Sequence, residues 1–287
     1  MGAMKRASSI ACGAVALLLM VSSCSDEQEA PRKVRRRPGQ SPATPQAAAM
    51  PPAVQDGVEI VWFGEPGKSQ KKSEGLRKAG KREGSWTWWD ASGKLAVTGQ
   101  FEADEETGLW TEYYPTQAKK REDHWVAGRR HGLSIEYHEN GQKKQELNFV
   151  EGLQQGPFQA WHPDGKPATS GSALDGKFDG EIREWYPSGQ LKQQARFDKG
   201  QQVGLQERWY ENGQLESSTN FAAGVPDGPV KSFYPDGKVR FEGTFAKNLR
   251  TGEWRCFKPD GSADATASGV YESGARKSAL PEEGGAK

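Results

Sequence analysis

The sequence predicts an all-β fold, an elongated single-layer antiparallel β-meander of about eight β-hairpins of 24 residues each. Two observations support this prediction. The first is a glycine that recurs every 24 residues, at Gly84, Gly108, Gly132, Gly156, Gly180, Gly204, Gly228 and Gly252. The second is an aromatic residue five positions after each of these framing glycines, at Trp89, Tyr113, Tyr137, Trp161, Trp185, Trp209, Phe233 and Phe257. A fixed period of this length is typical of repeat arrays, in which each unit buries surface only against its neighbours.

Each unit contains a turn that suits a hairpin, as in Tyr234-Pro235-Asp236-Gly237. Proline presets the φ angle of the second turn residue, aspartate suits the third, and glycine accepts the left-handed position that follows a type I turn. Such a connection with a glycine bulge joins antiparallel strands. The segment Tyr114-Pro115-Thr116-Gln117 lacks the glycine, so we expect a distorted hairpin there.

A second turn precedes each framing glycine, as in Phe197-Asp198-Lys199-Gly200. Its glycine recurs at positions 80, 128, 152, 176, 200 and 224. Asp104 and Asn248 replace it in two repeats, and both residue types tolerate left-handed backbone geometry. Two turns in each repeat therefore predict two short strands in each repeat.

The strand alternation predicts which side chains share a face. Across the hairpin turn, Tyr186 should oppose Gln190, and Trp185 should oppose Leu191. We expect positions five, eleven and seventeen after each framing glycine to lie on one apolar, aromatic-rich face. The other face should be polar and exposed, interrupted by a row of aromatic side chains: Tyr114, His138, His162, Tyr186, Tyr210 and Tyr234.

The repeat unit resembles a known family. The segment from Tyr234 to Trp254, Y-P-D-G-K-V-R-F-E-G-T-F-A-K-N-L-R-T-G-E-W, resembles the variant form of the MORN repeat, found in bacterial proteins often labelled YwqK-like antitoxins. The resemblance covers about residues 80–274. It implies an elongated, twisted sheet of consecutive hairpins, and some proteins with related repeats act as scaffolds or bind partners and membranes.

The first 23 residues resemble a secretion signal, in which Lys5 and Arg6 precede an apolar stretch from Ile10 to Val21 that is too short to span a bilayer. The segment Val21-Ser22-Ser23-Cys24 resembles the lipobox of bacterial lipoproteins, which implies that Cys24 is lipidated and becomes the new N-terminus. A plain signal peptide is the alternative. By analogy with lipoproteins, Ser25 in place of aspartate implies an exported protein anchored in the outer membrane.

Composition divides the rest of the chain. Residues 24–56 are rich in Pro, Ala, Gln and charge, which predicts a disordered tether. Its basic run, Arg32 to Arg37, is either a contact for anionic headgroups or a solvated linker. Residues 57–79 are interpreted as a degenerate capping hairpin with Ile60, Trp62 and Phe63 in its apolar strand, residues 80–274 as the repeat array, and residues 275–287 as a disordered tail.

The sequence offers no pattern for catalysis, a metal or a cofactor. His138 and His162 occupy one position in adjacent repeats, about 9–10 Å apart across two strands, too far to share a zinc ion. We interpret them as substitutes for tyrosine in the exposed row, and the recurrent glycines as turn residues. With Cys12 in the signal and Cys24 lipidated, Cys256 has no disulfide partner, and we interpret it as an ordinary strand residue. The chain is therefore expected not to be an enzyme.

Charge argues against a nucleic-acid partner. Without its signal the chain has 37 basic and 38 acidic residues, whereas nucleic-acid binding favours a basic excess or stripe.

The function that fits best is a lipid-anchored scaffold of the cell envelope that presents its sheet to a protein or an envelope polymer. The candidate binding face consists of Trp161, Trp185, Trp209, Tyr186, Tyr210 and Tyr234. Large exposed apolar patches usually mark interactions, although the same aromatics could serve only as the core of the array. The alternatives are an exported antitoxin or immunity-like protein that neutralises a toxin by binding, and an envelope hydrolase.

Overall fold

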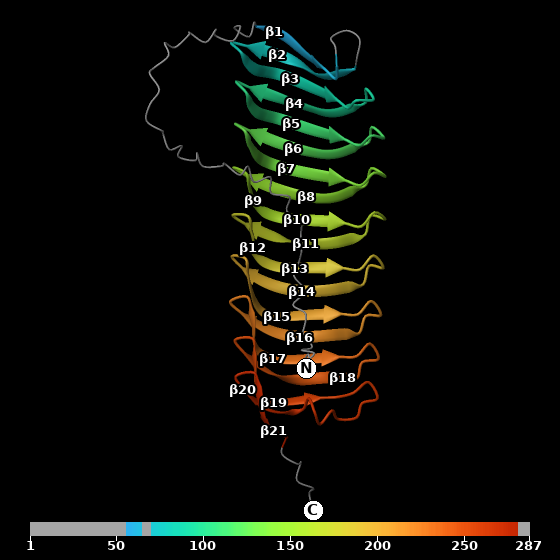
Figure 1. Cartoon of the computed structure of the whole chain (residues 1–287), viewed down its shortest axis with the longest axis vertical. Helices are drawn as coiled ribbons and strands as arrows, with labels where there is room; N and C mark the ends of the chain where they lie inside the picture. Colours follow the sequence, from blue (N-terminus) through green and yellow to red (C-terminus); the bar gives the residue numbers. More distant parts are fainter. Residues whose placement is uncertain (1–55, 65–69, 281–287) are drawn as a thin grey trace, which may run out of the picture. The chain divides into compact units, whose positions relative to one another are not determined.

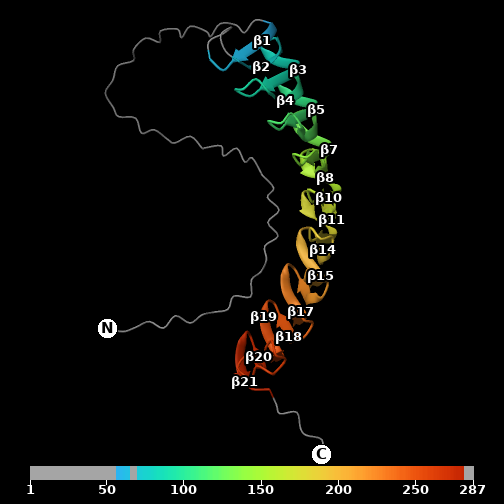
Figure 2. The same cartoon turned by 90° about the vertical axis from the view of Figure 1, so that its right-hand side faces the viewer.

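A computed structural model describes residues 56–64 and 70–280, which all belong to one compact unit, Pro51–Lys287. In these residues the chain forms strands and turns without a helix, and each strand pairs with its neighbour in chain order (Figure 1). The predicted all-β antiparallel meander is therefore confirmed. Within this unit the sheet is long, narrow and bent into an arc (Figure 2).

The strands are short, and the longest, such as β3 and β15, have 9 residues. They are β1 Gly57–Trp62, β2 Lys71–Lys78, β3 Lys81–Trp89, β4 Leu95–Glu102, β5 Glu105–Tyr113, β6 Lys119–Val126, β7 Arg129–Tyr137, β8 Lys143–Val150, β9 Leu153–Gln154, β10 Gly156–Trp161, β11 Pro167–Leu174, β12 Lys177–Phe178, β13 Gly180–Trp185, β14 Leu191–Asp198, β15 Gln201–Trp209, β16 Leu215–Ala222, β17 Val225–Phe233, β18 Val239–Ala246, β19 Leu249–Cys256, β20 Gly269–Glu272 and β21 Ala275–Ser278. Strands β9 and β12 are two-residue segments that lead directly into β10 and β13.

The hairpin turns have the predicted geometry. The amide of Tyr186 donates to the carbonyl of Gln190 at 2.9 Å, and Trp185 pairs with Leu191. The expectation of a distorted hairpin at Gln117 is wrong. Gln117 adopts a φ of 70°, and the Tyr114 amide donates to the Ala118 carbonyl at 2.8 Å, as in the glycine-containing turns. The Gln117 side chain also bonds both backbone groups of Leu95, at 3.2 and 3.1 Å, which compensates for left-handed geometry without glycine.

The turns at the other edge of the sheet place two successive residues at positive φ. Lys199 and Gly200 have φ values of 48° and 86°, which is the pattern of a type I′ turn. Asp104 and Asn248 have φ values of 75° and 66° and so take the glycine position as predicted. The Gly200 amide donates at 2.8 Å to the carbonyl of Phe178 in β12, so this turn is bonded to the strand that follows the preceding turn.

The prediction that positions five, eleven and seventeen share a face is wrong. Trp185 pairs with Leu191, but Glu184 pairs with Gln193, so Lys192 is an extra residue in a β-bulge. The bulge reverses the side-chain alternation. Phe197, seventeen residues after Gly180, therefore pairs with Gly180 itself and lies on the face opposite Trp185.

Most framing glycines are bulge residues inside strands, not the turn residues that we expected, whereas Gly156 and Gly180 begin β10 and β13. Gly204 lies within β15 at a φ of 71°. The pairing of β15 with β14 shifts beside it, from Arg196 with Val203 to Gln194 with Glu207. Each framing glycine therefore supplies a left-handed conformation that a β-bulge requires and that most side chains disfavour.

We number positions by their offset from the framing glycine. The core face carries offsets 2, 4, 13, 15 and 17, and the open face carries offsets 1, 3, 5, 11, 14 and 16. Buried apolar side chains such as Trp86, Phe101, Ile182 and Trp254, exposed by 3% or less, all lie on the core face. Aromatic residues therefore occupy both faces, and the expected division into one aromatic face and one polar face is wrong.

Tryptophan on the core face packs flat over glycine of the preceding strand. A Cβ atom on Gly75, Gly99 or Gly243 would lie 2.2–2.4 Å from the indole ring of Trp86, Trp110 or Trp254, respectively. Each of these indoles donates from Nε1 to a carbonyl of the same preceding strand at 3.1–3.2 Å. Where offset 15 is Ala195 or Thr219 instead of glycine, the facing residue is Gln206 or Val230, which is smaller than tryptophan. The facing pairs are therefore complementary in size.

Only one end of the array departs from the sequence interpretation, because the hairpin expected over residues 57–79 is present as β1 and β2. In the first hairpin, Gly57 pairs with Arg77 and Trp62 with Lys71, which are the pairings of a framing glycine and an offset-5 aromatic. Its loop is three residues longer than the others, and this insertion conceals the period in the sequence. At the other end, β21 pairs with β20, so the expected disordered tail is wrong for Ala275–Ser278.

We predict that Gly99→Ala destabilises the array by about 1–3 kcal/mol, because a Cβ atom would overlap the Trp110 ring. The measurement is chemical denaturation followed by tryptophan fluorescence. Ala195→Gly, at the same offset, is the matched control and should change stability by about 1 kcal/mol or less. An equal cost of Gly99→Ala in a Trp110→Gln background would contradict the packing argument.

Candidate binding surface

The three predicted tryptophans lie together on the open face. Trp161, Trp185 and Trp209 end strands β10, β13 and β15, all at offset 5, and each is half-buried. Across their hairpins they pair with Pro167, Leu191 and Leu215. Neighbouring strands lie about 4.8 Å apart, so rings two strands apart stand at intervals of about 10 Å. The structure thus brings these three side chains into one row.

The three predicted tyrosines have a different role. The hydroxyl groups of Tyr186, Tyr210 and Tyr234 donate to the backbone carbonyls of Trp209, Phe233 and Phe257 in the next repeat, at 3.0, 2.8 and 2.9 Å. Their side chains are half-buried, and burial raises the pKa of Tyr186 and Tyr210 above the ordinary tyrosine value. These tyrosines join successive repeats and are not an exposed row.

His138 and His162 make the same connection. Their Nε2 atoms lie 2.9 and 3.0 Å from the carbonyls of Trp161 and Trp185 in the next repeat. A carbonyl only accepts hydrogen bonds, so each ring carries its proton on Nε2. This geometry supports the interpretation that histidine substitutes for tyrosine, although both rings are half-buried rather than exposed.

A chain of three side chains crosses the open face at β6 and β7. The Tyr137 hydroxyl donates to Glu122 Oε2 at 2.6 Å, and Lys119 Nζ lies 2.6 Å from the other carboxylate oxygen. Burial and the adjacent carboxylate raise the pKa of Tyr137 to about 12. The Lys119 and Tyr137 hydrogen bonds outweigh the effect of burial and lower the pKa of Glu122. Glu122 is therefore favoured as an anion that accepts one hydrogen bond at each carboxylate oxygen.

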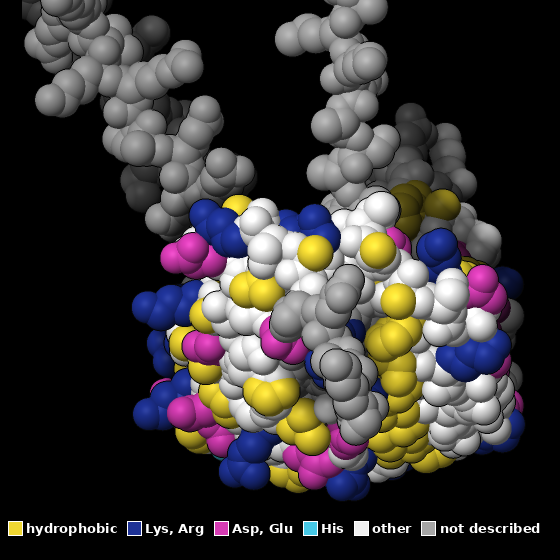
Figure 3. All heavy atoms as spheres, turned by 90° about the horizontal axis from the view of Figure 1, so that it is seen from below, with side chains coloured by type: hydrophobic (Ala, Val, Ile, Leu, Met, Phe, Trp, Pro, Cys, Tyr) yellow, Lys and Arg dark blue, Asp and Glu magenta, His cyan; other side chains and the backbone are white. Residues whose placement is uncertain are grey.

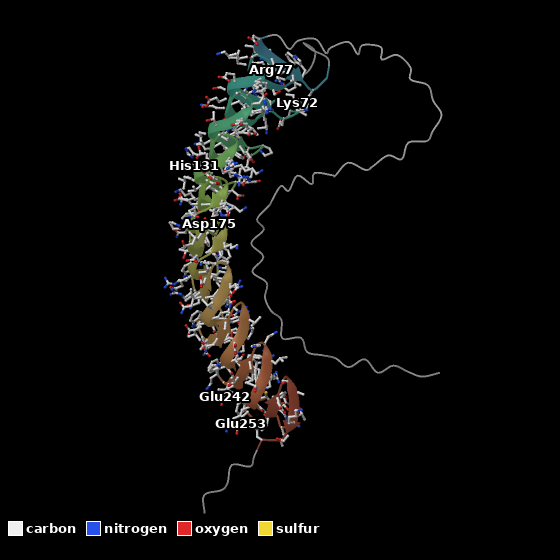
Figure 4. The ribbon with its side chains drawn as sticks, turned by 90° about the vertical axis from the view of Figure 1, so that its left-hand side faces the viewer. Lys72, Arg77, His131, Asp175, Glu242 and Glu253 are labelled. Carbon is white, nitrogen blue, oxygen red and sulfur yellow. The ribbon has the colours of Figure 1, made fainter. Side chains whose placement is uncertain are left out.

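A polar hollow that no sequence pattern indicated lies on the open face near the C-terminal end of the array. Its volume is about 340 Å³, and residues of β16, β17, β18 and β19 line it. Its polar lining comes from Ser218, Asn220, Lys231, Glu242, Thr244, Glu253 and Arg255. Figure 4 shows Glu242 and Glu253 close together at this end of the array. An end-on view shows hydrophobic side chains in patches between charged and neutral polar ones (Figure 3).

The remaining candidates have simple placements. Cys256 is buried at the end of β19, its Sγ lies 3.5 Å from the Ala267 carbonyl, and burial raises the pKa of its thiol. No group of three or more His, Cys, Asp or Glu side chains among residues 56–64 and 70–280 is arranged to hold a metal ion. The predicted lipidation site, Cys24, and the predicted signal and tether lie outside the described residues.

The repeats are similar to those of a known family. The MORN repeat variant model matches residues 82–103, 130–151, 178–199, 202–223 and 226–247. Five repeats match the MORN repeat variant family. Each matched segment begins two residues before a framing glycine. The hairpin of β5 and β6 is not matched, yet it has the same pairing and the same bulge as the matched hairpins on either side.

Similarity to curated proteins and to solved structures gives no information on function. No curated protein matches the chain. Two solved structures, "Crystal Structure of TcdB2-TccC3" and "Crystal Structure of TcdB2-TccC3-Cdc42", are similar at 12% identity over 74% and 66% of this chain, with TM-scores of 0.21 and 0.15. The chain spans 14% of the length of each of those chains. TM-scores this low support no functional argument. In the described residues no helix has the length and apolar character needed to cross a membrane.

We predict that Tyr210→Phe destabilises the array by about 0.5–1.5 kcal/mol, because the bond to the Phe233 carbonyl is lost. Tyr210→His should restore most of that stability, since His138 and His162 make the equivalent bond. The free energy of unfolding from urea titrations measures both effects. Tyr113→Phe is the control, because the structure shows no hydrogen bond from that hydroxyl to the described residues. Equal stability of Tyr210→Phe and the wild type would contradict the assignment.

Proposed function

We propose that this protein is a membrane-tethered binding scaffold whose array of hairpins presents its open face to an extended partner. Matches to MORN repeat variants support the general role of a repeat-based binding scaffold. Lipid on Cys24 would hold the chain at the outer membrane, and residues 25–56 would serve as the tether. The partner would be a protein strand or an envelope polymer that lies along the array.

The row of Trp161, Trp185 and Trp209 is the observation that carries this proposal. Sheet packing explains the buried aromatics of the core face, but the three tryptophans lie on the other face and keep part of their surface exposed. Partly exposed tryptophan supplies a large, rigid contact area and is enriched at binding interfaces. Rings about 10 Å apart in three successive repeats suit a partner that is long and extended.

Polar side chains beside the row would give the partner hydrogen bonds. Offsets 3 and 14 on the same face carry Arg183, Gln194 and Glu207. The Gln194 amide donates to Glu207 Oε2 at 2.7 Å, which leaves its own carbonyl oxygen as an acceptor. A half-apolar, half-polar surface of this kind is typical of transient binding interfaces.

The proposal gives the repeats no catalytic role. The hydroxyl groups of Tyr186, Tyr210 and Tyr234 and the Nε2 atoms of His138 and His162 are already bonded to backbone carbonyls. Glu122 accepts hydrogen bonds from Lys119 and Tyr137. These groups support the sheet and do not converge on a common point, as groups of an active site would.

We predict that Cys24→Ala moves the protein from the membrane fraction to the soluble fraction. The substitution removes the residue that would carry the acyl chains, and two or more acyl chains are needed for a stable anchor. Fractionation and immunoblotting of cells measure this shift. Cys256→Ala is the control and should stay in the membrane fraction, because Cys256 is buried in the sheet. Unchanged fractionation of Cys24→Ala would contradict the anchoring proposal.

The binding surface can be tested by photocrosslinking in cells from each face of the sheet. A crosslinking residue at Arg183, on the open face, should capture a partner, and one at Gln145, on the core face, should not. Trp185→Ala with Trp209→Ala should abolish capture while the array remains folded. Trp254→Ala, at a side chain with 0% exposure, should instead unfold the C-terminal repeats. Capture from Gln145 alone would contradict the proposal.

A further inference from the structure

The two ends of the sheet differ in how they expose backbone. In the described part of the chain β1 pairs only with β2, so its outer edge is unpaired (Figure 1). The sequence of β1, Gly-Val-Glu-Ile-Val-Trp, is rich in β-branched and aromatic residues. At the other end, β21 is four residues long, is exposed at each residue, and carries Arg276 and Lys277. Short strands and basic residues are the usual protection of a sheet edge, and β1 has neither.

The outer edge of β1 presents backbone groups that pair elsewhere in the array. Within the repeats, the amide of an offset-5 residue faces the preceding repeat, as Phe257 donates to the Arg240 carbonyl at 2.9 Å. Backbone groups alternate in direction along an antiparallel strand. In β1 the residues whose backbone groups face outward in the same way are Val58, Ile60 and Trp62. Among the described residues there is no preceding repeat with which these backbone groups could pair.

Apolar side chains accompany this edge. Val58 is 66% exposed, Ile60 and Val61 are each 38% exposed, and the adjacent Phe63 is 41% exposed. Val58 also borders a hollow of about 400 Å³ on the open face, together with Leu76 and Trp89. Glu59 is the only charged side chain of β1, and it is paired with Arg77 Nε at 2.7 Å. The edge is therefore apolar, and its one charge is already neutralised.

We propose that β1 is a dimer interface at which it pairs antiparallel with β1 of a second copy of this chain, about a two-fold axis through Ile60. In that register Ile60 opposes Ile60 of the second copy, and Val58 opposes Trp62 on the open face. Aromatic side chains facing β-branched ones are favourable cross-strand pairs. On the core face each Glu59 opposes Val61 of the other copy, so the two carboxylates do not face each other directly.

The sequence of β1 favours a second copy of this chain as the partner for its outer edge. The strand is self-complementary in the register centred on Ile60, which is the condition for a two-fold interface. Pairing of β1 with β21 of another copy would instead build an open filament, and the short basic β21 disfavours it. The pairing closes at two copies and joins their sheets end to end. This proposal does not depend on membrane attachment or on the identity of any partner.

The test is sedimentation equilibrium of the full chain carrying Cys24→Ala, which removes the lipid. The chain with Cys24→Ala alone should have twice the monomer mass, and the chain that also carries Ile60→Lys should have the monomer mass, because like charges would meet at the axis. Leu205→Lys is the matched control, since Leu205 is 46% exposed inside the array, and it should remain a dimer. Far-ultraviolet circular dichroism checks that each variant is folded.

Mixing variants tests the register. Ile60→Lys and Ile60→Glu should each be monomers alone and should form a mixed dimer when combined, because opposite charges would then meet across the axis. A monomeric chain with Cys24→Ala alone would overturn the proposal. A dimer that persists in Ile60→Lys would also overturn it, because another surface would then join the copies.

Discussion

Hydrogen bonding between successive hairpins is the constraint on which the rest of this structure depends. A lone two-stranded hairpin is marginal in water, and a single-layer sheet has no second layer to cover it. Each repeat therefore gains its stability from the next one. The backbone ladder joins them through the middle, tyrosine or histidine side chains join them at one edge, and turn amides join them at the other.

This constraint explains which residues are available for binding. The Tyr210 hydroxyl and the His162 ring are fixed to carbonyls of the next repeat, so they support the sheet. The core face is closed by tryptophan packed over glycine, as in Trp254 over Gly243. The hydrogen bonds between repeats and the packing of the core face both hold the sheet that carries the tryptophan row of the open face. Neither of them covers that row.

The repeats and their turns could be predicted from the sequence because they depend on local backbone chemistry. Proline, aspartate and glycine specify the hairpin turn wherever they occur together, and the period of 24 residues was visible without any structure. The first hairpin was expected over residues 57–79, but Gly57 was not recognised as its framing glycine, because a longer loop displaces Gly57 from the period. Gln117 was misjudged because its compensating bonds reach Leu95 of the preceding strand, which sequence alone does not identify.

The sequence by itself determined the fold class, the two turns of each repeat and the aromatic positions. Only the tertiary structure decided the faces on which those aromatics lie. One extra residue in a bulge, such as Lys192, reverses the alternation of every side chain beyond it, and a bulge is defined by pairing between strands. For the same reason only the structure could distinguish the roles of Trp185 and Tyr186, which are adjacent in the chain. Trp185 lies on the open face, whereas Tyr186 donates a hydrogen bond to the next repeat.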